Sequence, residues 1–196
     1  MKRIIFATSN EGKMREIRAI MEDSGYEVVS LKEAGISIDV EENGTTFEEN
    51  AIIKASTIAK ATGELVLADD SGLEVDYMDK APGVYSARFL GADTDYVIKN
   101  NYILEKLQGV PKEERSARFV CVIALSYPDG TCITRRGTIE GYIGYEIRGE
   151  NGFGYDPIFM VDEYNKTTAE LSMEEKNQIS HRAKALRAIK EQLAKE

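Results

Sequence analysis

Apolar positions near the start of the chain follow a strand spacing first and then a helix spacing. Residues 2–8 predict a buried strand, and residues 13–24 predict a helix because their apolar positions lie three and four apart. Residues 27–31 predict a second strand, and alternation over residues 36–40 predicts a half-buried third. The chain therefore begins with alternating strands and helices.

A second helix is predicted over residues 46–62. It begins where Thr46 and Glu49 have the spacing of a capping box, in which each side chain bonds the backbone N–H of the other residue. The next segment is strand-like over residues 65–68, and apolar residues alternate again over residues 73–77.

A hairpin is the clearest signal in the second half of the chain. Its turn is Tyr127-Pro128-Asp129-Gly130, between apolar stretches at residues 116–125 and 131–140. The other predicted elements are a helix from Asp93 to Gly109 and a last helical region opened by Ser172 and Glu175. Because helices and strands alternate early and a hairpin follows, the sequence predicts an α/β fold with a mixed sheet.

Length and charge narrow the classes of protein. The 196 residues suit a single domain, 1–196. With 25 basic and 34 acidic residues, the formal net charge is −9, which argues against binding long nucleic acid because that requires a broad basic face. The apolar runs are too short for an export signal or a membrane span, so we expect a cytoplasmic protein that binds no membrane.

The numbers of cysteine and histidine residues also limit which metal ions the protein could bind. One histidine and two cysteines without a CxxC pair argue against a zinc site. Without an export signal, Cys121 and Cys132 are expected to be reduced core residues. A catalytic metal would be a hard ion held by carboxylates.

The first candidate site lies where the first strand ends and the first helix begins. It consists of Thr8, Ser9, Asn10, Glu11, Gly12 and Lys13. Such a junction offers free backbone N–H groups and the positive end of a helix dipole, so it suits a phosphate, to which Lys13 adds a positive charge. It is not a Walker A loop, because Met14 follows Lys13 where Ser or Thr is required. An ordinary helix start is the alternative.

The second candidate site is an acidic residue, Glu42, together with the second helix. At 100° per residue, Asn50 and Lys54 fall on one edge of the apolar face of that helix. A lysine there can bury its stem and aim its charge into a cleft. A solvated acidic helix start is the alternative, but it explains Glu42 and Lys54 less well.

The third candidate site is Asp69-Asp70-Ser71-Gly72, which follows an apolar strand. Adjacent aspartates are costly to hold together as ions, and a divalent cation would cancel their repulsion. Strand ends in α/β sheets are also where ligands usually bind. An acidic turn without further function is the alternative.

Two further candidates lie near the C-terminus. Residues 149–159 are rich in glycine, so Phe153 or Tyr155 could stack on a flat ring; alternatively, both aromatics fill the core. His181 and Arg182 are adjacent and could donate together to a carbonyl oxygen, although a lone histidine is more often structural.

These motifs, in this order, resemble one family over nearly the whole chain. The matching stretches are TSNEGKMREI, NGTTFEENAIIKA, LADDSGLEVD, APGVYSARF, FGYDPIF and EEKNQISHRAKAL. The sequence resembles the non-canonical purine nucleoside triphosphate pyrophosphatases, the inosine and xanthosine triphosphatase family. The resemblance implies a cytoplasmic, Mg²⁺-dependent enzyme, commonly a homodimer. It also implies an elongated, twisted mixed sheet with flanking helices and two lobes around a nucleotide cleft.

The resemblance also implies a reaction and residue roles. Inosine, deoxyinosine and xanthosine triphosphates (ITP, dITP and XTP) would be hydrolysed to the monophosphate and pyrophosphate, which cleanses the nucleotide pool. Glu42 and Asp70 would bind magnesium, with Asp70 as the base for the attacking water. Residues 8–13 and Lys54 would hold the triphosphate, and Ser71 would touch the substrate. The base pocket would consist of Phe153, Gly154, Tyr155, Asp156, Lys176, His181 and Arg182.

Side-chain chemistry gives this assignment a physical basis. Lys13, Lys54 and magnesium would reverse the repulsion between an acidic protein and a triphosphate. Lys176 and Arg182 can only donate hydrogen bonds, so they suit the 6-oxygen of hypoxanthine or xanthine and would stay unpaired against the 6-amino group of adenine. This argument does not reject guanine, which also has a 6-oxygen.

Two other functions remain open at the level of sequence. A related pyrophosphatase could prefer modified pyrimidine nucleotides. Alternatively, a nucleotide-binding module could sense a nucleotide without hydrolysing it, although the presence of Glu42, Asp69 and Asp70 together counts against a silent binder.

Overall fold

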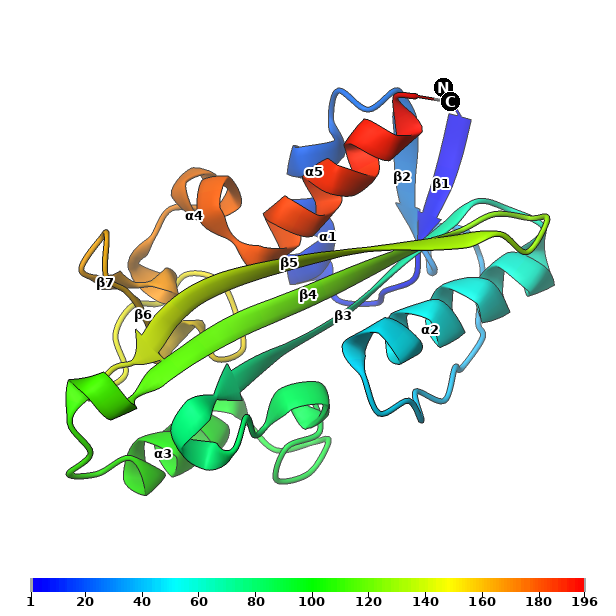
Figure 1. Ribbon diagram of the computed structural model, residues 1–196. Coiled ribbons are helices and arrows are strands. Elements are labelled where there is room, and N and C mark those ends of the chain that lie inside the picture. Colours follow the sequence, from blue (N-terminus) through cyan, green and yellow to red (C-terminus); the bar gives the residue numbers. More distant parts are fainter. Residues whose placement is uncertain (1, 196) are drawn as a thin grey trace. The chain divides into compact units, whose positions relative to one another are not determined.

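The computed structural model describes residues 2–195, whose strands form one mixed sheet in the order β2-β1-β3-β4-β5-β6-β7 (Figure 1). The strands are β1 (Lys2–Phe6), β2 (Tyr26–Ser30), β3 (Val66–Val75), β4 (Ser116–Ser126), β5 (Cys132–Ile143), β6 (Phe159–Val161) and β7 (Lys166–Thr167). β1 pairs in parallel with β2 and β3, whereas β6 is antiparallel to β5 and β7. The predicted α/β class with a mixed sheet is confirmed.

The helices are α1 (Glu11–Met21), α2 (Phe47–Thr62), α3 (Tyr96–Lys106), α4 (Met173–Ile179) and α5 (His181–Leu193). The described residues divide into two compact units. Unit 1 consists of residues 2–71, 121–137 and 181–195, and unit 2 consists of residues 72–120 and 138–180. β3, β4 and β5 each contribute residues to both units. The single domain expected over the whole chain stays a prediction.

Unit 1 is a three-layer structure in which helices cover both faces of its strands. α1 and α5 pack side by side on one face, and α2 lies on the other (Figure 1). The α1–α5 side buries Phe6, Ile17 and Leu186 in one apolar cluster. Ala55 and Ile58 on α2 are fully buried, which gives the second face an apolar contact as well.

Unit 2 has an apolar core of its own. Leu73 on β3, Ile103 on α3 and Phe159 on β6 belong to it. The ring of Phe159 packs against that of Phe119 on β4, with 4.4 Å between the ring centroids. Each unit therefore has its own apolar core, and the candidate site residues belong to both units: Asp70, for example, to unit 1 and Phe153 to unit 2.

The helix starts expected at Thr46 and Ser172 are confirmed. Thr46 and Glu49 form the reciprocal capping box at the start of α2, and Ser172 and Glu175 form one at the start of α4. The turn between β4 and β5 also forms, with the Tyr127 N–H donating to the Thr131 carbonyl at 2.8 Å. α3 begins later than expected, because Asp95 rather than Asp93 accepts its first N–H bond.

Two strand predictions were wrong: the strand over residues 36–40 does not form, and the strand before Asp69 is longer than expected. None of the described residues from 36 to 44 belongs to a strand, although exposed and half-buried residues alternate there. Ile38, Asp39 and Val40 all line a cavity, so the alternation of exposure there does not mark a strand. Conversely, residues 69–72 do not form a turn, because β3 continues through them from Val66 to Val75.

Among residues 2–195, no helix is long and apolar enough to cross a membrane.

Candidate active site

The two adjacent aspartates of β3 meet different surroundings in unit 1. Because successive side chains of a strand point to opposite faces, Asp69 and Asp70 cannot share one environment. Asp69 is fully buried, whereas Asp70 is half-buried beneath α2. Asn50, on α2, donates to Asp70 Oδ2 at 3.1 Å, and its Oδ1 atom accepts from the Gly44 N–H at 2.8 Å. Asn50 therefore ties the loop before α2 to the carboxylate.

Lys54 lies one helical turn after Asn50 and faces the same strand. Its Nζ atom donates to the Asp69 carbonyl at 2.9 Å and forms an ion pair with Glu42 Oε1 at 3.0 Å. Glu42 and Lys54, together with Thr8 and Ser9, also line a cavity of about 280 Å³ in unit 1. The expected placement of Asn50 and Lys54 on one helix edge thus gathers a cation and two carboxylates at β3.

Asp69 is the centre of a buried charge network. Lys13 Nζ lies 2.9 Å from Asp69 Oδ2, and the Ser71 hydroxyl donates to the same oxygen at 2.9 Å. The Arg182 guanidinium lies 3.5 Å from it. Burial alone would raise the pKa of Asp69, but Lys13, Arg182 and Lys54 outweigh it and hold that pKa well below its usual range.

Asp70 shows the opposite behaviour. Burial raises the pKa of Asp70 to about 6, and the negative charges of Glu42 and Asp69 add to this increase. The hydrogen bond from Asn50 and the positive charge of Lys54 lower the pKa but do not outweigh burial. A carboxylate with this pKa accepts a proton more readily than an ordinary aspartate near neutral pH. Of the two, Asp69 is a fixed anion and Asp70 is the group suited to proton transfer.

The loop before α1 presents a helix N-terminus in unit 1. Asn10 is the N-cap, and its side chain accepts from the Lys13 N–H at 3.0 Å. Ser9, Asn10 and Glu11 are exposed, Gly12 is half-buried, and Thr8 Oγ1 accepts from the Asn10 N–H at 3.1 Å. The exposed start of an 11-residue helix beside Lys13 is a favourable place for an anion.

His181 and Arg182 begin α5 and are both buried in unit 1. Arg182 donates to Glu16 Oε2 at 2.5 Å as well as approaching Asp69, so its guanidinium bridges two carboxylates. Gly137, on β5, lets the start of α5 lie directly against this strand, because a Cβ atom there would overlap the His181 carbonyl. The structure thus gives Arg182 a role in the charge network that the sequence did not reveal.

The two aromatic side chains of the glycine-rich loop in unit 2 differ in burial. Tyr155 is 4% exposed, packs edge-on against Tyr96 of α3, and donates to the Ser86 carbonyl at 2.6 Å. Phe153 is only half-buried. Tyr155 is therefore part of the core, and Phe153 is the aromatic that can reach a ligand. The carbonyl of Gly154, between them, accepts from Asn100 at 3.2 Å.

Asp156 and Lys176 form a buried ion pair beside Phe153. Lys176 Nζ lies 2.7 Å from Asp156 Oδ2 and 4.9 Å from the centroid of the Phe153 ring. The Phe153 N–H donates to the same carboxylate oxygen at 3.0 Å. Lys176 and Phe153 are thus held next to each other by one anion.

Comparison with known proteins assigns the chain to a family. The model of the Ham1 family matches residues 4–192. The chain belongs to the Ham1 family. A protein of Bacillus licheniformis named dITP/XTP pyrophosphatase is 53% identical and matches over 96% of both chains. A Bacillus subtilis protein with the same name is 51% identical over the same shares.

Solved structures of Ham1 proteins share the fold. A Ham1 protein from Coxiella burnetii is 41% identical and superimposes with a TM-score of 0.90 over 100% of both chains. The Staphylococcus aureus Ham1 protein is 44% identical and has a TM-score of 0.88 over 99% of both chains. This agreement supports the strand order found here for a Ham1 chain.

Sequence reasoning missed two residues of this Ham1 chain that contact the candidate groups. Glu16 had no signal, because a glutamate in a surface helix is unremarkable until its buried arginine partner is known. Thr168 lies in a stretch for which the sequence predicted no helix, strand or site. Its hydroxyl nevertheless donates to Asp156 Oδ1 at 2.7 Å. Neither contact follows from sequence spacing.

Proposed function

We propose that this Ham1 protein is a nucleoside triphosphate pyrophosphatase. It hydrolyses ITP, dITP and XTP to the nucleoside monophosphate and pyrophosphate. The carrying observation is the cluster of Asp70, Glu42, Asn50 and Lys54, found in a chain about half identical to relatives named dITP/XTP pyrophosphatase. Removal of such substrates would cleanse the nucleotide pool.

Magnesium is the proposed cofactor, and Glu42 and Asp70 are its proposed ligands. Carboxylate oxygens suit this hard cation, which binds through one or two carboxylates plus substrate phosphates. Within residues 2–195, no group of three or more metal-ligating side chains is assembled, so phosphate oxygens would complete such a site. Burial raises the pKa of Asp70, with a smaller contribution from the negative charges of Glu42 and Asp69, and a divalent cation would favour the ionised carboxylate. When bound, magnesium supplies charge stabilisation to the phosphates.

The chain's own groups would bind the triphosphate from several directions. Lys13 and Lys54 bring positive charge, and residues 8–12 bring the backbone N–H groups of the α1 N-terminus. Ser71 lies beside Asp69 and would touch the substrate. Charge that builds on the leaving pyrophosphate during cleavage is stabilised by these fixed cations more than the ground state is.

Asp70 is proposed to hold the attacking water and to accept its proton. Without a metal its pKa of about 6 suits a general base near neutral pH, and a magnesium ion held by the same carboxylate would lower that pKa, so holding the water in place is the larger part of the proposed role. Asn50 orients the carboxylate by donating to Oδ2. Asp69 is unsuited to the same task, because its cationic partners stabilise its ionised form.

Base recognition is proposed to rest on Phe153 and Lys176, with Asp156 holding both. Phe153 would stack on the purine, and Lys176 would donate to its 6-oxygen. Adenine, with a 6-amino donor, could not accept the N–H bond that Lys176 would give to a 6-oxygen, at a cost of about 1–3 kcal/mol. Gly154 and Tyr155 would contribute backbone and packing. His181 and Arg182, which belong to unit 1, remain proposed contacts of the base.

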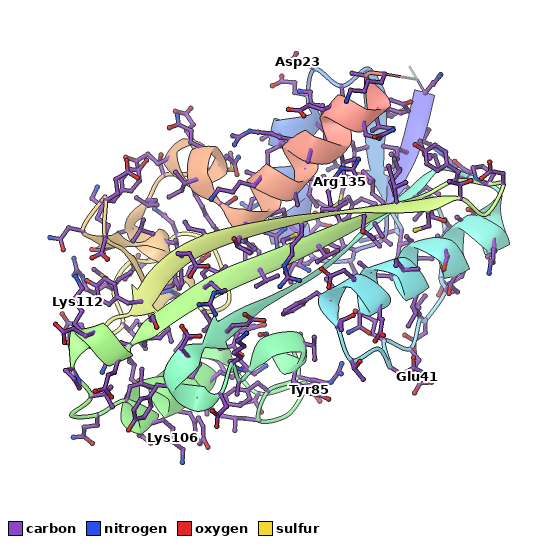
Figure 2. The ribbon with its side chains drawn as sticks, viewed as in Figure 1. Asp23, Glu41, Tyr85, Lys106, Lys112 and Arg135 are labelled. Atoms are coloured by element: carbon purple, nitrogen blue, oxygen red, sulfur yellow. The ribbon has the colours of Figure 1, made fainter. Side chains whose placement is uncertain are left out.

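A homodimer in the cytoplasm is the proposed setting. The large apolar side chains that are exposed include Tyr85, Leu90, Val97 and Ile98, all in unit 2. Figure 2 shows Tyr85 on the surface of that unit. Burial of such residues against a second copy would remove them from water. Sedimentation of the purified protein tests this, with a monomer contradicting it.

The decisive experiment measures products. ITP, ATP and GTP are incubated separately with the protein, with and without Mg²⁺, and nucleotide and phosphate products are quantified. Inosine monophosphate (IMP) plus pyrophosphate, dependent on Mg²⁺ and far faster than with ATP, supports the proposal. Inosine diphosphate plus phosphate would contradict the site of attack, and faster turnover of a pyrimidine panel would favour the pyrimidine enzyme.

A further inference from the structure

The carboxylate of Asp156 has a third partner that no role above explains. Thr168 Oγ1 donates to Oδ1 at 2.7 Å, whereas Lys176 and the Phe153 N–H both contact Oδ2. Thr168 is 3% exposed, Asp156 is 2% exposed, and Lys176 is 5% exposed. The hydroxyl and the ammonium therefore hold opposite oxygens of one buried anion.

Bonds on both oxygens fix the plane of a carboxylate. Rotation about the bond between Cβ and Cγ would break the Thr168 bond on one side and the Lys176 bond on the other. Neutral donors to a charged acceptor form strong hydrogen bonds when buried. The Thr168 hydroxyl thus resists a rotation that would release Lys176 and the Phe153 N–H together.

The backbone on each side of this arrangement is itself restrained. Thr168 follows Thr167, which forms a capping box with Glu170: the Thr167 N–H donates to Glu170 Oε2 at 2.8 Å. On the other side, Gly152 has a φ of +73°, and a Cβ atom there would overlap Asp156 Oδ2. The carboxylate therefore sits between a fixed turn and a backbone that comes close only because it lacks a side chain.

We propose that Thr168 is a positioning residue for base recognition, a role that rests on the proposed function. Through Asp156 it sets the direction of the Lys176 ammonium and the position of the Phe153 ring. An ammonium has three N–H groups in fixed relation to one another, so orienting one of them orients the others. Ordering these groups before binding lowers the cost of recognising a 6-oxo purine.

Three variants separate the hydroxyl from the shape of the side chain. Thr168→Val removes the hydroxyl and keeps the volume, Thr168→Ser keeps the hydroxyl, and Thr168→Ala is used if the valine variant does not fold. In Thr168→Val we expect a KM for ITP about tenfold higher, equivalent to about 1.4 kcal/mol, with kcat unchanged. The preference for ITP over ATP falls with it, while Thr168→Ser stays close to wild type.

A second readout needs no turnover. Amide hydrogen exchange at Phe153, followed by NMR in the absence of nucleotide, is expected to quicken about tenfold in Thr168→Val and to return to the wild-type rate in Thr168→Ser. A purely structural role would lower the Tm and leave KM, selectivity and this amide unchanged. Wild-type KM and selectivity in a folded Thr168→Val or Thr168→Ala protein would overturn the proposal.

Failure of the proposed function is distinguishable from failure of this inference. If the wild-type protein does not cleave ITP, the pyrophosphatase assignment fails, and calorimetric binding of IMP takes the place of kinetics. Weaker IMP binding by Thr168→Val than by Thr168→Ser would then support the positioning role. Equal binding by the two variants, or no binding by wild type, would overturn it.

Discussion

Two buried or half-buried carboxylates, Asp70 in unit 1 and Asp156 in unit 2, are held in opposite ways. Asp70 accepts from the Asn50 amide and the Ser71 N–H, each at 3.1 Å, and lies near the charge of Lys54, but burial and two neighbouring carboxylates still raise its pKa, so its charge is incompletely compensated. Asp156 has an ammonium, a hydroxyl and a backbone N–H within 3.0 Å, so its charge is well compensated. The first arrangement is costly until a cation or a proton arrives, whereas the second is complete by itself.

This difference matches the two proposed roles, reaction at Asp70 and recognition of the base at Asp156. A group that takes up a proton or a metal must be left partly uncompensated in the free protein. A group that defines a binding surface should already be rigid, because ordering it during binding costs affinity. Substitutions at both carboxylates and at their neighbours test whether they differ in this way.

The largest effect is expected from Asp70→Asn. Turnover of ITP should fall by roughly 10³-fold, because general-base catalysis contributes roughly 10²–10⁴ and the variant also lacks a proposed metal ligand. Thermal stability should not fall, since the raised pKa of Asp70 shows that its ionised form is disfavoured in the folded protein. Steady-state kinetics and calorimetry measure both. Near-normal turnover would remove Asp70 from the mechanism.

Asp156→Asn should mainly affect folding. Replacing one member of a buried ion pair leaves Lys176 without its countercharge and should lower the free energy of unfolding by about 3 kcal/mol. Asp162→Asn is the matched control in the same unit, because Asp162 pairs with Lys112 at an exposed position, and it should change stability by less than about 0.5 kcal/mol. Urea denaturation compares them; equal effects would show that the Asp156 pair is not special.

Glu42→Gln should weaken magnesium dependence without abolishing turnover. We expect the Mg²⁺ concentration for half-maximal rate to rise about tenfold, equivalent to about 1.4 kcal/mol. Glu41→Gln is the neighbouring control, since Glu41 is exposed and its side chain points outward (Figure 2). A parallel shift in both variants would indicate a general charge effect in place of ligation.

The smallest effects are expected at the two capping boxes. Thr46→Ala in unit 1 and Ser172→Ala in unit 2 should each lower the free energy of unfolding by about 1 kcal/mol. Only Ser172→Ala should also weaken the preference for ITP over ATP, because α4 carries Lys176, whereas α2 carries Lys54, which is proposed to hold the triphosphate that both nucleotides share. Chemical denaturation and kinetics with both nucleotides test this asymmetry, and a loss of preference in Thr46→Ala alone would reverse it.

Elements governed by local chemistry could be predicted from the sequence. Thr46 and Glu49 fixed the start of α2, because a capping box depends on four consecutive residues. Alternation over residues 36–40 misled, because half-buried and exposed residues also alternate in a segment that pairs with no other strand of residues 2–195. Asp69 and Asp70 looked like a turn because charge is unusual inside a sheet; cations from elements far away in the chain allow the strand to continue.

The candidate site was predictable as a set of residues, but not as a set of contacts. Helical spacing placed Asn50 and Lys54 on one edge, where the structure brings them to Asp70, Asp69 and Glu42. Spacing could not distinguish Tyr155, which is buried, from Phe153, which is not. Their difference depends on α3 and on Ser86, which are distant in sequence.

The pairing of α1 with α5 also has a consequence for synthesis of the chain. Glu16 and Arg182 are 166 residues apart, and the helices that carry them share the core of unit 1. At about 5–20 residues per second, α1 emerges from the ribosome roughly ten to thirty seconds before its partner helix. During that interval the side of α1 that α5 covers, with a carboxylate destined for burial, remains in water. α1 therefore completes its burial only after α5 has been made, and until then a chaperone could shield the side that α5 will cover.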